Sequence, residues 1–272
     1  MKARHRSEAG SYQFGASATE SEELQRLKLQ ATVAIKLERE AWQAAGLRSG
    51  MRVLDLACGP GFISCELARA AGPGQVTGVD LSPELLATAD HVRQTEQVQN
   101  VTFTAGSVYD LPLPEAQFDF VYARFLFQHL ARPRQALDNI RRVLKPGGIL
   151  CVLDIDDNWT SFAPGSEAFT GFIRQSGAGQ KRRGGNRLIG SQLFGLLRRA
   201  GFRNVAVRIH PLTTEELGLR TFLGLAVMFR AQMLSKPGRL LALPRLGKIR
   251  AAAQDPDAWG AVGIFLATGI RD

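Results

Sequence analysis

Residues 53–62 (VLDLACGPGF) constrain the fold of this chain most, because an apolar run there ends in a turn that contains two glycines. A helix-like stretch follows, and the next apolar run closes on Asp80, roughly 20 residues beyond those glycines. This order of strand, turn, helix and strand is the layout of a nucleoside-binding βαβ unit. We therefore expect an α/β fold that holds a cofactor containing adenosine.

The residues of this unit indicate how such a cofactor would be held. Gly59 and Gly61 stand at the turn, where a side chain would keep a ligand away from the backbone amides. Asp80 ends the second strand, and a carboxylate there can accept hydrogen bonds from both hydroxyls of a ribose. Asp55 is placed to orient the loop or to face a positive charge on the ligand. An ordinary strand-to-helix turn is the alternative, since Ser64 replaces the third glycine of the dinucleotide-binding pattern.

Three later motifs add to this unit: residues 103–112 (FTAGSVYDLP), 118–124 (FDFVYAR) and 142–150 (RVLKPGGIL). Together with the glycine turn they resemble the class I S-adenosylmethionine-dependent methyltransferases over residues 46–157. Residues 12–15 (YQFG), 185–187 (GNR) and 189–190 (IG) are similar to a bacterial small-molecule branch of that family, which resembles methyltransferase domains 11 and 25. The resemblance thus extends over most of the chain.

The resemblance implies an α/β fold with a Rossmann-like, doubly wound sheet of seven strands. Most strands would be parallel and the last antiparallel, with an N-terminal helical cap and inserted lid helices. We expect residues 1–45 to form a tail and cap, 46–157 the cofactor-binding core, and 158–272 the lid segments and the C-terminal part of the same sheet. A chain of 272 residues with 45% hydrophobic residues can bury one such core.

The elements expected from hydrophobic periodicity follow the same plan. A helix over residues 21–45, capped by Ser21, precedes the core. Strands are predicted at 52–56, 75–79, 101–105, 118–123, 148–154, 204–209 and 261–268, and helices at 62–71, 83–94, 133–144 and 191–200. Residues 158–183 read as a mobile segment with aromatic anchors, 214–234 as one apolar helix that serves as lid or core, and the opening residues as disordered.

The resemblance also implies which residues meet S-adenosyl-L-methionine. The loop over residues 57–61 would meet its methionine part, Asp80 its ribose, and Ser107 with Val108 its adenine. Ser107 stands where the family often has an acid, so it would accept a hydrogen bond without charge assistance. The full set of expected cofactor contacts is Tyr12, Asp55, Ala57, Cys58, Gly59, Gly61, Asp80, Leu81, Ser107, Val108, Arg124 and Phe125.

The sulfonium already carries an activated methyl group, so the protein mainly has to align an acceptor for in-line displacement. Arg124 is the candidate for positioning. His129 is the candidate general base, where one is needed, with a packed or capping histidine as the alternative. Asp154, Asp156 and Asp157 follow the fifth strand, where they would bind a cationic acceptor or a divalent metal, or end a strand in solvent. We favour the last and predict no metal.

Composition and charge limit the kinds of partner that we expect this protein to bind. The net charge is +9, but only residues 181–183 form a compact basic run, and no aromatic residues interleave with it. Nucleic acid is therefore disfavoured against a solvated surface or an anionic or lipid-like substrate. No run approaches the ~20 apolar residues of a membrane span, and no apolar signal core follows residues 1–6, so we expect a soluble, cytoplasmic protein. The cysteines, Cys58, Cys65 and Cys151, have no metal-ligand spacing and read as buried fillers.

We thus expect a methyltransferase acting on oxygen, nitrogen or carbon of a small molecule, in specialised metabolism. Residues 122–125 (YARF) lack the Asn-Pro-Pro-Tyr-like loop of enzymes that methylate the amino groups of nucleic-acid bases. One alternative is an enzyme of the same fold with a non-methylating reaction such as a cyclisation. Others are an NAD(P)-dependent oxidoreductase and a cofactor-sensing module. The oligomeric state stays open.

Overall fold

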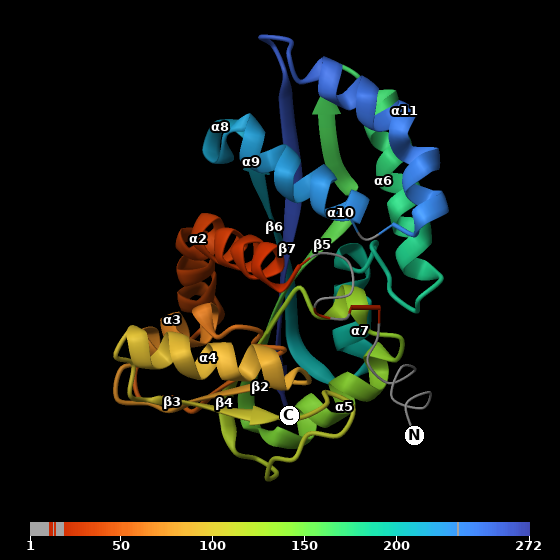
Figure 1. Ribbon diagram of the computed structural model, residues 1–272. Coiled ribbons are helices and arrows are strands. Elements are labelled where there is room, and N and C mark those ends of the chain that lie inside the picture. Colours follow the sequence, from red (N-terminus) through yellow and green to blue (C-terminus); the bar gives the residue numbers. More distant parts are fainter. Residues whose placement is uncertain (1–10, 13, 15–18, 233) are drawn as a thin grey trace.

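The computed structural model describes residues 11, 12, 14, 19–232 and 234–272. The predicted disorder of residues 1–10 lies outside this part of the chain. Seven strands form one sheet in the order β3-β2-β1-β4-β5-β7-β6 (Figure 1). Their bounds are β1 Val53–Leu56, β2 Val76–Asp80, β3 Val101–Ala105, β4 Phe118–Arg124, β5 Leu144–Ala163, β6 Phe202–Thr213 and β7 Trp259–Arg271.

The pairing of the strands confirms the predicted topology. Strands β3, β2, β1, β4 and β5 are parallel neighbours, whereas β7 runs antiparallel to both β5 and β6. The chain reverses its strand order after β3, when it crosses back past β1 to β4. In doubly wound sheets ligands bind outside the carboxyl ends of the strands at such a switch point. The fold therefore predicts a ligand site at the edge of the sheet where β1, β2 and β4 end.

Helices cover both faces of the sheet, as the alternation of side chains along β4 requires. Val121 and Ala123 join one buried cluster with helices α5 (Pro133–Val143) and α7 (Leu193–Arg199). Phe120 and Tyr122 join the other, with helices α2 (Glu20–Ala45) and α3 (Phe62–Ala71). Helix α4 (Pro83–Thr95) packs on this second face through Val92.

Helix α2 starts one residue earlier than predicted, and the predicted cap was wrong. Thr19, not Ser21, is the N-cap: its hydroxyl accepts a hydrogen bond from the Glu22 amide, and the Glu22 side chain accepts one from the Thr19 amide. This reciprocal capping box satisfies two amides at the start of the helix. The helix ends at Gly46, whose φ of 107° is left-handed.

The prediction of an irregular segment over residues 158–183 was wrong. Strand β5 continues to Ala163 against β7, and helix α6 spans Ser166–Lys181. The aromatic residues of this segment explain its order, because Phe162 and Phe169 pack against Phe222 with ring centroids 5.5 to 6.4 Å apart. They form the centre of a third buried cluster, outside the two that flank the parallel strands.

The predicted single helix over residues 214–234 is divided into α8 (Thr214–Leu217), α9 (Leu219–Leu223), a π-helical turn (Gly224–Met228) and α10 (Phe229–Gln232). Gly218, with φ 75°, separates the first two. Helix α11 (Lys236–Ala252) was not predicted, because Pro237, Pro244 and two glycines obscure its periodicity. No helix in the described ranges is long and apolar enough to cross a membrane.

Candidate functional site

The two glycines of the turn after β1 are required for different reasons. Both are left-handed, with φ of 55° at Gly59 and 79° at Gly61. A Cβ atom on Gly61 would lie 2.8 Å from the Ala89 Cβ atom and 2.9 Å from the Phe103 ring, so close packing excludes a side chain there. A Cβ atom on Gly59 would meet no described atom within 4 Å. Bare backbone at Gly59 therefore faces open space, which fits close approach of a ligand.

Asp80 is bonded directly to this turn. The Gly59 amide donates to Asp80 Oδ2 at 2.9 Å, and the Ser82 amide donates to Asp80 Oδ1 at 2.9 Å. Burial raises the pKa of Asp80, and these backbone hydrogen bonds oppose that shift. A carboxylate offers about four acceptor positions, so these bonds leave Asp80 with acceptor capacity for a ligand. Leu81 beside it is 52% exposed.

Asp55 lies beneath the turn rather than at its open side. It is 2% exposed, and the Ser64 hydroxyl donates to its Oδ2 at 2.6 Å. Desolvation raises the pKa of Asp55 to about 7. Ser64, which replaces a glycine of the dinucleotide pattern, thus joins the end of β1 to helix α3. Next in the chain, Ala57 is exposed with a left-handed φ of 56°, and Cys58 is buried.

A buried ion pair ties the end of β4 to the N-terminal helix. Arg124 Nε donates to Glu38 Oε1 at 2.7 Å, and the Tyr122 hydroxyl donates to Glu38 Oε2 at 2.7 Å. Arg124 Nη2 also donates to the Gln30 carbonyl at 2.9 Å. Phe125 has a left-handed φ of 49°. The Cζ atom of Arg124 lies 4.6 Å from the centroid of the Phe125 ring. Residues with left-handed backbone thus follow both β1 (Ala57) and β4 (Phe125), and such strain is common at ligand sites.

Glu38 was not identified from the sequence, although its place among the apolar residues of one helix face indicates a buried charge. Ala34, Ala41 and Trp42 form the buried face of α2, and Glu38 lies on that face at helical spacing. A charged residue there has to be paired, because burying an isolated charge is costly. The pairing with Arg124 shows why residues 20–45 pack where they do.

Tyr12 and His129, far apart in sequence, lie side by side. Their ring centroids are 5.4 Å apart, and the Tyr12 hydroxyl donates to Glu23 Oε1 at 2.6 Å. Burial raises the pKa of Tyr12, Glu23 adds to this, and the charge of Asp80 contributes as well. Asp80 is therefore an electrostatic neighbour of Tyr12, which brings the N-terminal residues to the same edge of the sheet.

The environment of His129 makes the imidazole a weak base. Its Nδ1 atom lies 2.9 Å from the Ser11 hydroxyl and 3.2 Å from Gln180 Nε2. Desolvation, followed by the charges of Arg187, Arg26 and Arg183, lowers the pKa of His129 to about 3. A general base works best with a pKa near the operating pH. The geometry therefore does not favour the predicted base, and it identifies Ser11 as a contact that the sequence did not indicate.

Ser107 and Val108 follow β3, which is separated from β4 by two strands, β2 and β1. The Ser107 hydroxyl accepts a hydrogen bond from the Tyr109 amide at 3.2 Å, and both Ser107 and Val108 are half-buried. Because β1 to β4 are parallel, the residues after their carboxyl ends lie along one edge of the sheet. The structure thus brings the turn after β1, Asp80, Ser107, Val108 and Arg124 to that edge.

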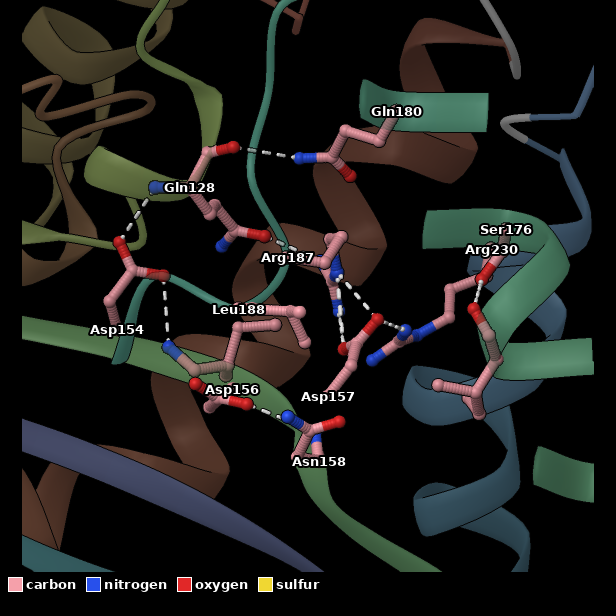
Figure 2. Close-up of polar contacts among 12 residues, drawn as sticks. Gln128, Asp154, Asp156, Asp157, Asn158, Ser176, Gln180, Arg187, Leu188 and Arg230 are labelled. Atoms are coloured by element: carbon pink, nitrogen blue, oxygen red, sulfur yellow. Dashed lines mark hydrogen bonds and ion pairs between the residues drawn. The ribbon is translucent and has the colours of Figure 1, made fainter. Parts of the chain in front are cut away.

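Asp154, Asp156 and Asp157 lie within β5 and do not end a strand in solvent, so the favoured expectation for them was wrong (Figure 2). Asp154 and Asp156 are fully buried and accept hydrogen bonds from the amides of Gln128 at 3.1 Å and Ser191 at 3.0 Å. Burial raises the pKa of Asp154 to about 7. In the described part of the chain, no group of acidic, histidine or cysteine residues is arranged to hold a metal ion.

Asp157 joins two arginines from different segments (Figure 2). Arg230 Nη1 donates to it at 2.8 Å and Arg187 Nη2 at 3.1 Å. Burial raises the pKa of Asp157, but Arg230 and Arg187 outweigh it and hold the pKa below its ordinary value. Arg187 also bonds to the Gln128 side chain, and burial lowers its pKa to about 10. Arg187, in the GNR motif of residues 185–187, is thus held by ion pairing.

Comparison with known proteins shows which proteins this chain resembles. Residues 47–177 match the family described as a methyltransferase domain. An uncharacterized methyltransferase of Schizosaccharomyces pombe is 38% identical over 111 residues, 39% of this chain and 40% of that protein. A demethylmenaquinone methyltransferase of Staphylococcus aureus is 36% identical over 110 residues, 40% of this chain and 45% of that protein. The matches span less than half the length of these two relatives.

The fold is also that of solved structures. A protein from Bacillus halodurans superposes with a TM-score of 0.61 at 18% identity, over 85% of this chain and 97% of the other. That match covers a larger share of the chain than residues 47–177. Residues 47–177 of this chain are therefore similar in sequence to a methyltransferase domain, and the chain shares its fold with the solved structure.

Proposed function

We propose that the protein transfers a methyl group from S-adenosyl-L-methionine to oxygen, nitrogen or carbon of a small-molecule acceptor. The observation that supports this best is the contact between the Gly59 amide and the Asp80 carboxylate, beside open space at Gly59. A nucleoside seated there would meet bare backbone and a carboxylate that still has free acceptor positions. We assign the methionine part to residues 57–61, the ribose to Asp80 and Leu81, and the adenine to Ser107 and Val108.

In this proposal the remaining residues of the site position the acceptor, contact the cofactor or support the glycine turn. When bound, the cofactor supplies a methyl group that is already activated. Arg124 is fixed by Glu38, and Phe125 lies against it, so this pair can position an acceptor without moving. Tyr12 is assigned to the cofactor carboxylate. Asp55 supports the turn from below through Ser64.

His129 fits a positioning role better than proton transfer. Its neutral ring contacts Ser11, and the Ser11 amide donates to the His129 carbonyl at 3.0 Å. These contacts hold residues 11 and 12 over the edge where the cofactor would lie. In this proposal residues 46–157 bind the cofactor, residues 1–45 cover it, and residues 158–272 complete the sheet and supply the lid.

The charge and the chemical class of the acceptor are also part of the proposal. Arg26, Arg183 and Arg187 lie close enough to His129 for their charges to lower its pKa. These nearby cations favour an acceptor with an anionic group over a cationic one. We propose a small molecule of specialised metabolism and a cytoplasmic setting, and we do not propose nucleic acid as a substrate.

The test is transfer of label from S-adenosylmethionine carrying an isotopic methyl group to candidate metabolites, with the Asp80→Ala variant as control. We expect labelled product with the unaltered protein and a large loss with the variant. A product that forms without label would replace methyl transfer by a reaction such as a cyclisation. Calorimetric titration with NAD or NADP gives a second check, since tight binding of a dinucleotide alone would favour an oxidoreductase.

A further inference from the structure

Helix α11 carries a cluster of leucines on its outer face. Leu240, Leu241 and Leu243 are exposed by 68%, 69% and 57%, whereas Ala242 and Ile249 are buried. The buried residues belong to the third cluster, and α11 packs along α6 at the margin of the molecule (Figure 1). One exposed leucine needs no explanation, but neighbouring ones on one helix mark an interaction surface.

The charges of α11 surround this apolar strip on both sides. At about 3.6 residues per turn, Leu240, Leu243, Pro244 and Gly247 share one face of the helix. The flanking positions are basic on either side, with Arg239 and Arg250 on one side and Lys248 and Arg245 on the other, and Lys236 begins the strip itself at the start of the helix. The helix contains no acidic residue, and within the described ranges no ion pair joins these five cations to a carboxylate.

We propose that α11 docks the protein on an anionic lipid surface. An apolar strip bordered by lysine and arginine is the pattern of a helix that lies in the membrane interface, with its leucines among the acyl chains and its cations at the head groups. If α11 instead packed against α11 of a second copy of the chain, the five cations of one helix would face the five of the other and repel them. Nucleic acid would pair with the cations but leave the leucines in water. Only a surface both anionic and apolar covers both features.

Docking in this way affects the lid segments. Helix α11 shares its buried cluster with Phe222 of α9 and with Ala226 and Val227 of the π-helical turn. A bilayer that holds α11 would therefore lie next to the elements that follow β6. This surface is separate from the glycine turn, so its role does not depend on the reaction proposed above.

The test is co-sedimentation of the full chain with sucrose-loaded vesicles. Vesicles of phosphatidylcholine alone are compared with vesicles that also contain phosphatidylserine, at low and at physiological salt. We expect binding to the anionic vesicles only, weakened by salt. The variant Lys236→Gln/Lys248→Gln should bind roughly fivefold more weakly for each charge removed. The variant Lys28→Gln/Lys36→Gln, with two exposed lysines of α2 replaced, is the matched control and should bind normally.

The leucines are tested separately, since a purely electrostatic contact would not need them. Leu240→Ser/Leu243→Ser should lose most vesicle binding, and Leu29→Ser, at a leucine that is 40% exposed on α2, should keep it. Equal thermal melting curves confirm that all variants fold. Absence of vesicle binding at low salt overturns the proposal. So does binding that the leucine variant retains and that competing RNA removes, or a dimer in sedimentation that Leu240→Ser/Leu243→Ser dissociates.

Discussion

At the scale of single residues, Gly59 and Gly61 can be separated by experiment. Gly61→Ala combines left-handed strain with overlap against Ala89, and should destabilise the fold by about 2–5 kcal/mol. Gly59→Ala meets only open space, so it should cost the strain alone, about 1–2 kcal/mol. It should nevertheless weaken S-adenosylhomocysteine binding, because its methyl group occupies the proposed ligand position.

Urea unfolding and calorimetric titration of both variants provide the measurement. Equal losses of stability in the two variants would contradict the packing explanation for Gly61. Wild-type affinity in Gly59→Ala would remove the cofactor from the place assigned to it.

The shifted pKa of His129 predicts a pH dependence of stability. The unfolded chain protonates this residue near pH 6.5, whereas the folded protein does so only near pH 3. Between these values the unfolded state binds more protons, so the contribution of His129 to stability rises with pH and is complete above pH 6.5. The slope should approach at most about 1.4 kcal/mol per pH unit.

Urea unfolding of the protein and of His129→Gln at several pH values isolates this contribution. The difference in unfolding free energy between the two proteins should grow from pH 4 to pH 6.5 and then stay constant. A difference that does not change with pH would mean that His129 is protonated as easily in the folded state as in the unfolded one.

At the scale of elements, Asp157 is the point where β5, the loop before α7 and helix α10 are joined. Asp157→Asn would leave Arg187 and Arg230 buried beside each other without a countercharge, and should cost about 3–5 kcal/mol. Arg230→Met leaves Asp157 paired with Arg187, so it should cost less and mainly release α10.

Hydrogen exchange of residues 214–232 and thermal melting distinguish the two variants. We expect faster exchange in that segment for Arg230→Met with an almost unchanged core. A larger loss of stability for Arg230→Met than for Asp157→Asn would show that the two ion pairs do not share one carboxylate in the way described.

The elements also show how far the sequence alone could go. The strands and helices from residue 53 to residue 154 are set by local alternation, turn glycines and caps, and these were predicted nearly residue by residue. Beyond β5 the order depends on contacts between distant segments, such as Phe162 and Phe169 with Phe222. Local periodicity does not record such contacts, so α6 was missed and the lid segment was predicted as one helix.

The same limit applies to the candidate site. The glycine turn and Asp80 follow from strand ends in a parallel sheet, which the sequence can indicate. The pairing of Arg124 with Glu38 and the burial of Asp154 depend on how distant helices pack. They were missed, and the aspartates were predicted to be solvated for this reason.

At the scale of the whole molecule, cofactor binding and folding are linked. A ligand that binds only the folded state stabilises it, by about 2.7 kcal/mol at a concentration 100 times its dissociation constant. S-adenosylhomocysteine should therefore raise the unfolding free energy of the protein. Asp80→Ala should weaken binding by about 1–3 kcal/mol and reduce this stabilisation accordingly.

The measurement is thermal or urea unfolding at a fixed concentration of S-adenosylhomocysteine. Asp90→Ala, at an exposed carboxylate on α4, is the control and should be stabilised as the unaltered protein is. Full stabilisation of Asp80→Ala by the ligand would contradict the assignment of the ribose to Asp80.

Strand β7 has a consequence for biosynthesis. It lies between β5 and β6, and among the described residues β7 is the one strand that pairs with β6. During translation β6 therefore emerges with nowhere to dock, and its exposed edge stays open to aggregation until residues 259–271 have left the ribosome. A nascent chain arrested before that point should engage chaperones, although the parallel strands β1 to β5 are already synthesised.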